Sequence, residues 1–367
     1  MKFTCFRSDM SNAVGNVQRA VSTKTTIPAL EGILIQAYED KLKLSGYDLE
    51  IGMSTVIEAA VSQVGSVVVS AKLLLDIVRK LPEEIIEFSV DERMVIYIKS
   101  GNADYQIVGI PADEYPEMPK FDTEDELEIK ASTFRDMVRQ TIFAVSELKD
   151  TPVYTGSYYE MTPNQLRIVT IDGFRMAVRT EQVNCEKVPP FIVPAKTQRE
   201  VINLITNEES TIKLNIGKRH ISFNIDNYSV ISRLIEGTFI NYQNTIPQQK
   251  ETEVIIKTRR LLDSVERMSL ITSDKIRIPL KLKFTKDGIS LTCSTTIGKA
   301  NDFISCDCFG KDVLVGFNHR FLIDALKNTD CDEVRLSIKG PLDPMTITPV
   351  SGDSFLFLVV PMRISAE

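Results

Sequence analysis

Histidine, tryptophan and glycine-rich loops are scarce or missing in this sequence. Its 367 residues include 2 histidines and no tryptophan. Neither His220 nor His319 has an acidic partner near it in the sequence, so a Ser-His-Asp relay or a histidine-based zinc centre is difficult to assemble. No glycine loop of the phosphate-binding type is found. We therefore expect no catalytic residue, no metal and no cofactor.

Cysteine is present, but not in the patterns that staple a chain or hold a metal. The six cysteines are scattered, and no targeting segment places them in an oxidising compartment. The close pair Cys306 and Cys308 has the spacing of neighbours on one strand face, whereas a zinc site needs further ligands at short spacing. We interpret all six as reduced structural thiols: Cys5, Cys185, Cys293, Cys306, Cys308 and Cys331.

Long hydrophobic runs are also missing. No apolar stretch approaches the roughly 18 to 20 residues that a membrane span needs. The first residues, MKFTCFRSDMSN, lack the apolar core of a signal peptide. With 43% hydrophobic and 25% charged residues, the composition is that of a folded globular chain. We expect a cytoplasmic protein with no membrane partner.

A short strand followed by an amphipathic helix occurs three times along the chain. Apolar residues at three- and four-residue steps mark one helix face each time. Equivalent apolar positions are Met10, Phe134 and Leu261, which lie 124 and 127 residues apart. This period predicts three copies of one structural unit.

A second helix in each copy supports the same period. The segments that start these helices, each after a short apolar strand, begin at Val69, Val193 and Val315, which lie 124 and 122 residues apart. An alternating apolar and polar strand, with one buried face, is predicted after each of them. These strands are Ile86–Val90, Ile212–Ile216 and Val334–Ile338.

The repeated pattern predicts an α+β fold of three tandem similar domains, in which helices cover one face of antiparallel sheets. Irregular proline-bearing stretches near residues 115–119 and 242–247 separate the copies. We place the domains at residues 1–120, 126–247 and 252–367. The alternative is a single irregular α+β domain with chance similarity between its parts.

Charge is distributed unevenly between the predicted helices and the rest of the chain. The net charge of −7 and the pI near 5.2 argue against a nucleic-acid partner. The six predicted helices nevertheless carry 15 lysines and arginines against 7 acidic residues, which leaves −15 for the remainder. They span residues 7–22, 70–81, 131–146, 194–205, 257–271 and 317–327.

The basic residues pair on the helix faces, as Lys72 does with Arg79 and Lys196 with Arg199. If the helices surround one axis, these faces line a surface that attracts a duplex phosphate backbone, while the acidic exterior repels it. Such contacts ignore base sequence and weaken with salt. The alternative is the ordinary polar face of an amphipathic helix.

Six segments of the chain stand out together: Met1–Thr4, Ile27–Ile35, Gly46–Ile51, Thr170–Ala177, Gly316–Asn318 and Val359–Arg363. Together they resemble one family, the bacterial sliding clamp or beta subunit of DNA polymerase III. The resemblance spans the whole chain. It implies a DNA polymerase processivity factor without enzymatic activity: a head-to-tail homodimeric ring of DNA-clamp domains, with helices lining the interior and antiparallel sheets outside, around duplex DNA.

The resemblance also implies two binding surfaces. Lys24, Lys72, Lys196 and Arg199 are expected near phosphates, and Arg79 joins them as the partner of Lys72. A hydrophobic pocket between the second and third domains is expected to take short linear peptides of the polymerase III catalytic subunit, the clamp loader, and other polymerases or repair proteins. Its matching residues are Tyr154, Ile171, Gly173, Phe174, Arg175, Met176, Ile240, Leu342, Pro344, Leu358, Val360, Pro361, Met362 and Arg363.

A subunit joint is implied as well. The first domain's edge strand, with Tyr105 and Ile107, is expected to meet Leu270 and Ile271 of a second copy's third domain. For the last two residues, a place in the domain core is the alternative. Two other functions are the alternatives to a clamp. One is a monomeric three-domain scaffold that binds proteins without encircling DNA, and the other is an enzyme using carboxylates such as Asp172 or Asp324.

Overall fold

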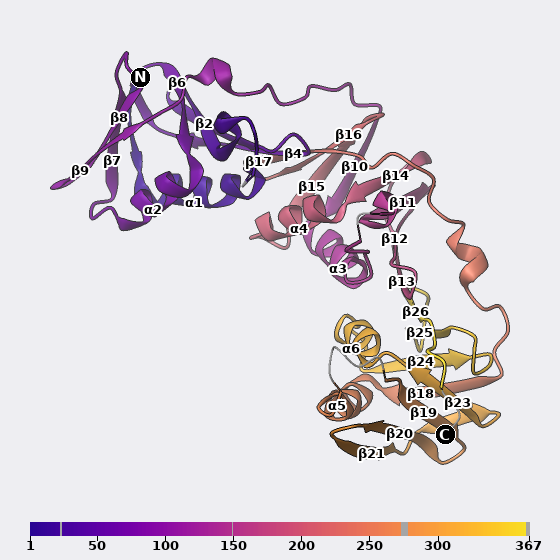
Figure 1. The fold of residues 1–367 in the computed structure, drawn as a ribbon. Coiled ribbons are helices and arrows are strands. Elements are labelled where there is room, and N and C mark those ends of the chain that lie inside the picture. Colours follow the sequence, from indigo (N-terminus) through magenta and orange to yellow (C-terminus); the bar gives the residue numbers. More distant parts are fainter. Residues whose placement is uncertain (23, 149, 273–277, 365–367) are drawn as a thin grey trace. The chain divides into compact units, whose positions relative to one another are not determined.

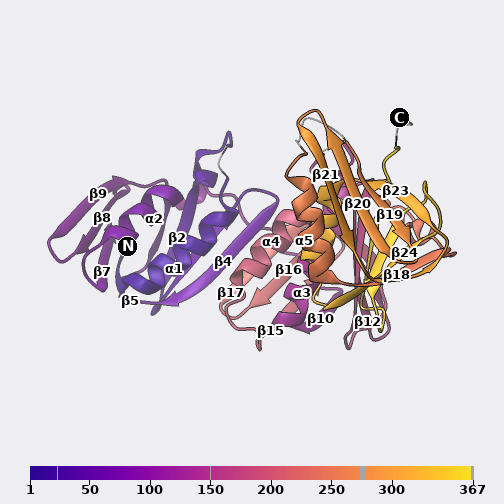
Figure 2. The same ribbon diagram turned by 90° about the horizontal axis from the view of Figure 1, so that it is seen from below.

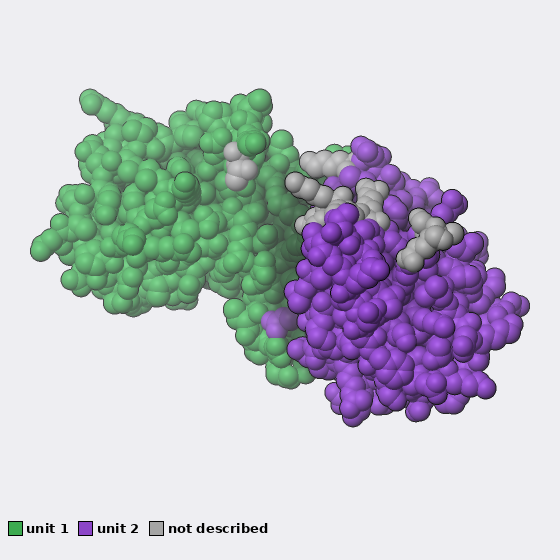
Figure 3. Space-filling model, turned by 60° about the horizontal axis from the view of Figure 1, so that its bottom comes forward, with its two compact units in different colours: residues 1–134, 196–234 green, residues 135–195, 235–367 purple. Residues whose placement is uncertain are grey.

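The computed structural model describes residues 1–22, 24–148, 150–272 and 278–364. Contacts group the chain into two compact units, residues 1–134 with 196–234, and residues 135–195 with 235–367 (Figure 3). Each unit is described by itself. No helix among the described residues is long and apolar enough to span a membrane.

The three repeats expected from the sequence fold with the same order of elements (Figure 1). Each begins with a strand and a helix, continues with four or five strands, and ends with a second helix and three strands.

The first repeat consists of β1 (Lys2–Phe6), α1 (Arg7–Val17), β2 (Gly32–Tyr38), β3 (Lys41–Tyr47), β4 (Ile51–Glu58), β5 (Ala60–Gln63), β6 (Gly65–Ser70), α2 (Ala71–Lys80), β7 (Ile85–Val90), β8 (Val95–Ser100) and β9 (Ala103–Val108). The second consists of β10 (Asp125–Lys130), α3 (Ala131–Ile142), β11 (Gly156–Thr162), β12 (Gln165–Ile171), β13 (Arg175–Gln182), β14 (Val188–Pro194), α4 (Ala195–Leu204), β15 (Thr211–Ile216), β16 (His220–Ile225) and β17 (Tyr228–Arg233). The third consists of β18 (Thr252–Lys257), α5 (Thr258–Ser269), β19 (Leu280–Thr285), β20 (Gly288–Thr295), β21 (Gly298–Ile304), β22 (Asp307–Gly310), β23 (Val313–Phe317), α6 (His319–Lys327), β24 (Glu333–Ile338), β25 (Met345–Pro349) and β26 (Phe355–Val359).

The helices lie on the sheets as their apolar spacing predicts. In the first repeat α1 packs on β1, β3 and β4, and α2 lies beside it on β2 and β6 (Figures 1 and 2). On α2, Leu74 and Val78 are buried, whereas Lys72 and Arg79 are exposed. The same arrangement recurs in the third repeat, where α5 and α6 pack side by side. One face of each helix is therefore apolar and buried, and the other is free to carry charge.

Three helices end two or more residues earlier than the sequence predicts. The first ends at Val17 and continues as a 3-10 turn over Gln18–Ala20, not to residue 22. The third ends at Ile142, not 146, and the fifth at Ser269, not 271. The apolar spacing runs on past each end because the following residues still pack on the core, as buried Val145 does. Hydrophobic periodicity therefore does not mark where the backbone leaves the helix.

Four antiparallel sheets contain these strands, and two of them join successive repeats. In the eight-stranded sheet β4 of the first repeat pairs with β17 of the second. In the nine-stranded sheet β13 of the second repeat pairs with β26 of the third. The second repeat is divided between the two compact units because its strands extend the sheets of both neighbours.

Candidate functional sites

A tight turn between β12 and β13 forms one part of the expected peptide surface. Asp172 holds this turn: its Oδ1 accepts the backbone N–H groups of Phe174 and Arg175 at 2.8 and 2.9 Å. Gly173 has φ +91°, a left-handed conformation that glycine adopts without strain. Asp172 and Gly173 thus form a hairpin turn, and this turn presents Phe174 with 59% of its surface exposed.

Arg175 fastens the turn to helix α6. Its Nε donates to Asp172 Oδ2 at 2.9 Å, and its Nη1 donates to Asp324 on α6. Its guanidinium lies 4.7 Å from the ring centre of Phe321 and 5.6 Å from that of Phe143. An arginine held by two carboxylates and two aromatic rings positions the turn, and its guanidinium is not free at the edge of the surface.

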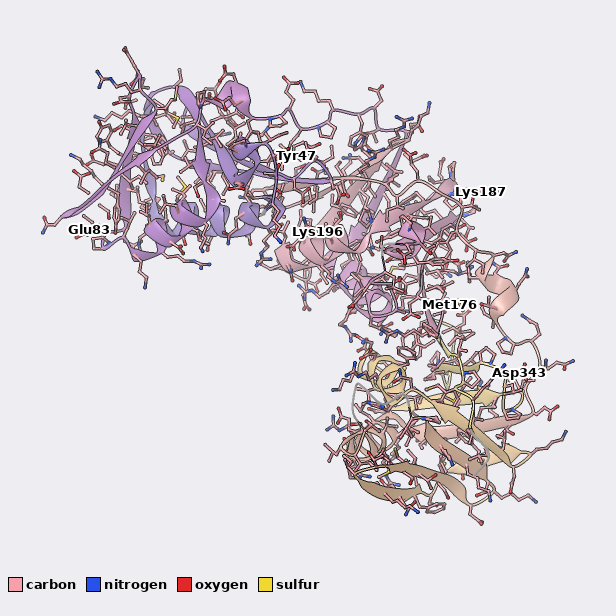
Figure 4. All side chains as sticks on the ribbon, in the orientation of Figure 1. Tyr47, Glu83, Met176, Lys187, Lys196 and Asp343 are labelled. Atoms are coloured by element: carbon pink, nitrogen blue, oxygen red, sulfur yellow. The ribbon has the colours of Figure 1, made fainter. Side chains whose placement is uncertain are left out.

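An apolar cluster lies under β13 and β26. Met176 and Leu358 are buried at its centre, and Tyr154, Ile171 and Val360 are partly buried against it. The labelled Met176 lies on β13 in Figure 4. The structure thus brings together five of the expected pocket residues from three separate stretches of sequence.

The chain after β26 runs back along this cluster. The backbone N–H of Val360 donates to Phe174 O at 2.9 Å, and that of Met362 donates to Gly316 O at 2.8 Å. Pro361 is half-buried and Arg363 is exposed. The end of β26 is therefore held between the β12–β13 turn and β23.

Three other expected pocket residues lie in connecting segments. Ile240 is exposed and follows buried Phe239, whose ring packs against Tyr154 at 5.6 Å between centroids. Leu342 is exposed in the turn between β24 and β25, and Pro344 is half-buried there. One accessible aliphatic group, Ile240, thus lies next to the cluster residue Phe239.

Sequence reasoning missed the aromatic residues that support this turn. Phe321 of α6 stacks on Phe174 with ring centroids 6.1 Å apart, and Phe143 packs edge-on against Phe357 at 5.2 Å. Phe239 was missed as well. Each is a single apolar residue, and nothing in its local sequence pattern distinguishes it from ordinary packing.

The expected DNA-contacting residues lie on accessible surfaces. Lys72 and Arg79 are exposed on α2, Lys196 and Arg199 are exposed on α4, and Lys24 is exposed in the loop before β2. Lys196, labelled in Figure 4, also donates to Asp48.

The expected subunit-joint residues occupy two places. Tyr105 and Ile107 lie half-buried on one face of β9, which is the edge strand of its sheet. Leu270, just past α5, is 80% exposed, whereas Ile271 packs against the core of the third repeat. The core alternative thus describes Ile271 better than Leu270.

Side chains for catalysis or metal binding do not converge in the described part of the chain. No group of three or more His, Cys, Asp or Glu side chains there is arranged to hold a metal. Asp172 and Asp324, the carboxylates of the enzyme alternative, are both bound by Arg175. Cys306 and Cys308 have their sulfurs 3.7 Å apart. Burial, with a smaller contribution from Cys308, raises the pKa of Cys306 to about 12, as suits a structural thiol.

Comparison with known proteins agrees with the three-repeat fold. The N-terminal, central and C-terminal domain profiles of the DNA polymerase III beta subunit match residues 1–119, 128–241 and 243–363. The beta sliding clamps of Bacillus subtilis and Halalkalibacterium halodurans are 29% and 30% identical over 99% of this chain and 100% of theirs. The crystal structure of the Bacillus subtilis clamp superposes with a TM-score of 0.97 at 28% identity, covering all of both chains.

The fold and the three matching domain profiles define a non-enzymatic DNA clamp of three tandem α+β domains. The chain belongs to the DNA polymerase III beta-subunit family, the beta sliding clamps. Members of this family are processivity factors: homodimeric rings that encircle DNA and bind polymerases and other proteins through a peptide pocket. The enzyme and monomeric-scaffold alternatives are therefore set aside.

Proposed function

We propose that this chain closes its ring by pairing β21 with β9 of a second copy. Within the chain, the strand after the central hairpin of one repeat pairs with the last strand of the next: β4 with β17, and β13 with β26. In the third and first repeats the equivalent strands are β21 and β9. Both are unpaired edge strands of their sheets, and an open edge is the natural place for a third joint of the same kind. This pair of open edges carries the proposal.

The position of Leu270 in the third repeat also supports this joint. Counting from the start of the first helix in each repeat, it is equivalent to Arg19 and Phe143. Arg19 forms an ion pair with Glu200 of the second repeat at 3.8 Å, and Phe143 packs on Phe357 of the third. Both earlier residues therefore contact the next repeat. We propose that exposed Leu270 contacts the first domain of the second copy, near its β9.

The proposed DNA contacts are Lys24, Lys72, Arg79, Lys196 and Arg199. Their support is exposure on loops and helix faces together with their positive charge. Lys and Arg ends reach phosphate oxygens without reading bases, which suits a protein that slides. A ring needs only weak contacts of this kind, because enclosure prevents sideways loss.

The proposed peptide site is the apolar surface around Met176 and Leu358, flanked by Phe174. Its support is the burial of the first two residues in the apolar cluster beside the β12–β13 turn. Asp172 and Arg175 hold this turn, which leaves Phe174 exposed. An apolar anchor of a partner peptide gains about 25 cal/mol for each Å² that it buries there. The expected partners are the polymerase III catalytic subunit, the clamp loader, and other polymerases or repair proteins.

We also propose the domain limits 1–120, 126–247 and 252–367, and a cytoplasmic location. The family profiles support limits near these positions. A role on bacterial chromosomal DNA supports the location.

Loading on nicked circular duplex tests the proposal. Clamp loaded on the circle is expected to stay bound through gel filtration and to fall off once the DNA is cut to a linear form. Leu270→Glu is expected to shift the chain to monomers in sedimentation and to abolish retention on circles. Glu266→Gln, on the helix that ends just before Leu270, serves as the matched control. Retention of wild-type protein on linear DNA, or a Leu270→Glu ring as stable as wild type, would contradict the proposed joint.

A further inference from the structure

An accessible cavity lies in the first repeat, at the end of β1. Its volume is about 410 Å³. It forms because the β1–β5 ladder stops at the pair Thr4 and Ala60, whereas β1 continues to Phe6. The lining includes Cys5, Phe6, Asp40, Glu58, Ala60 and Ile85.

Two exposed apolar side chains form one wall of this cavity. Phe6 and Ile85 are register partners across β1 and β7, with 58% and 56% of their surfaces exposed. Phe3 and Cys5 on the same strand are buried, so the alternation of the strand turns Phe6 to the opposite, outer face. The pair contributes little to the core of its own domain.

The other repeats show that the fold does not require apolar residues here. In the third repeat the equivalent register pair is Lys257 and Glu333, and both line a corresponding cavity of about 660 Å³. In the second repeat the equivalent pair is Lys130 and Thr211. Two of three copies thus place polar side chains where the first copy has phenylalanine and isoleucine. An exposed apolar pair kept in one copy indicates a contact specific to that copy.

The cavity of the first repeat is also acidic. Asp40 and Glu58 are exposed at its edge, and within the described residues no cation forms an ion pair with either. Lys41 lies opposite Glu58 in the β3–β4 ladder and offsets part of this charge. The cavity of the third repeat differs, because Arg260 and Lys286 line it.

From this combination we infer a second protein-docking site: the cavity binds an extended partner segment that carries an apolar side chain flanked by lysine or arginine. The apolar side chain packs on Phe6 and Ile85, and the cations face Asp40 and Glu58. Strand β5 is the edge of its sheet opposite β9. The site therefore remains open when β9 is used for subunit pairing, and it is separate from the surface around Met176.

The test uses a fluorescein-labelled heptapeptide of alternating lysine and leucine, with a glutamate and leucine peptide as its charge-reversed twin. Binding to the full chain is measured by fluorescence anisotropy. The Ile85 δ1 methyl group, followed by NMR, reports the location. Phe6→Lys with Ile85→Glu copies the polar pair of the third repeat at unchanged net charge, and Asp40→Asn with Glu58→Gln removes the acids. Asp113→Asn with Glu114→Gln, exposed acids elsewhere in the domain, is the matched control.

The lysine peptide is expected to shift the Ile85 methyl signal and to bind roughly tenfold more weakly to the Phe6→Lys/Ile85→Glu variant. Loss of the two acids is expected to weaken it by about fivefold, and salt near 0.5 M by a similar factor. The control variant is expected to bind as wild type does. Equal binding of the glutamate peptide, an unmoved Ile85 signal, or equal loss in the control variant would overturn the inference.

Discussion

Arg175 allows a sharp test of how the peptide surface is built. Its side chain is only 13% exposed, and it joins two carboxylates: Asp172, which is equally buried, and Asp324, which is 42% exposed. If Arg175 acts by positioning the turn, loss of Asp324 weakens peptide binding although Asp324 itself need not touch the peptide. If Arg175 instead contacts the peptide directly, loss of Asp324 leaves binding intact.

The expected magnitudes follow from burial. Removing one partner from a buried ion pair costs about 3–5 kcal/mol, but Asp172 still accepts two backbone N–H groups, so we expect about 3 kcal/mol for Arg175→Ala. Arg175→Lys keeps the charge and loses the forked geometry, at about 1–2 kcal/mol. Asp324→Asn removes a half-exposed partner, at about 1 kcal/mol.

Two measurements check these values. Hydrogen exchange of the Val360 N–H, which donates to Phe174 O, reports the local opening of the turn. Anisotropy with a labelled clamp-binding peptide of the polymerase III catalytic subunit reports affinity. We expect both variants to raise the exchange rate. Arg175→Lys is expected to weaken binding by about five- to thirtyfold and Asp324→Asn by about fivefold, in line with about 1–2 and about 1 kcal/mol.

Asp330→Asn is the matched control, because Asp330 accepts hydrogen bonds from Arg139 and Gln140 away from the turn. It is expected to leave the peptide affinity unchanged. Normal binding by Asp324→Asn combined with lost binding by Arg175→Ala would refute the positioning role.

Three further predictions concern charge, pH and thiol reactivity. Lys72→Ala and Arg79→Ala are each expected to lower the slope of log affinity against log salt for closed-circular duplex by about 1, measured by filter binding. Burial raises the pKa of Asp302, but hydrogen bonds from Ser264 and Arg267 outweigh it and leave the folded pKa below its ordinary value. Asp302 therefore stabilises the fold above its unfolded pKa of about 3.9, and this stabilisation is lost as pH falls through the folded pKa. In urea titrations, the stability gap between wild type and Asp302→Asn is expected to shrink below about pH 4 and to stay constant above about pH 6. Cys306, with its raised pKa, is expected to react with iodoacetamide at pH 8 far more slowly than free cysteine, as mass spectrometry of the labelled chain can show.

The repeat architecture could be predicted from the sequence because each helix and alternating strand leaves a local hydrophobic period. Strand Thr211–Ile216 is observed within one residue of its predicted range, and so are Ile85–Val90 and Glu333–Ile338. The sheet joints could not be found this way. Pairing of β4 with β17 depends on residues about 170 positions apart, and each strand alone shows only that one face is buried.

The ion pair between Arg175 and Asp324 illustrates what remained hidden in the candidate site. The two residues are 149 positions apart. The resemblance to the clamp family predicts Arg175 as a site residue, whereas Asp324 was named only as a carboxylate of the rejected enzyme alternative. A single charge on a helix gives no sign of its distant partner, so the internal role of this arginine became visible only in the folded chain.

The repeat period does, however, explain why the turn of the peptide surface exists. Asp48 and Asp172 are 124 residues apart, and each accepts the backbone N–H groups two and three residues ahead of it. Leu49 and Gly173 follow them with φ of +75° and +91°. The same turn thus serves two joints with different chemistry: Asp48 itself binds Lys196 of the next repeat, whereas Arg175 reaches Asp324 and leaves Phe174 exposed. The turn of the second repeat thus differs from that of the first in two features, an exposed aromatic residue and an acid paired with an arginine of the same turn, and these features support its proposed role as a binding surface.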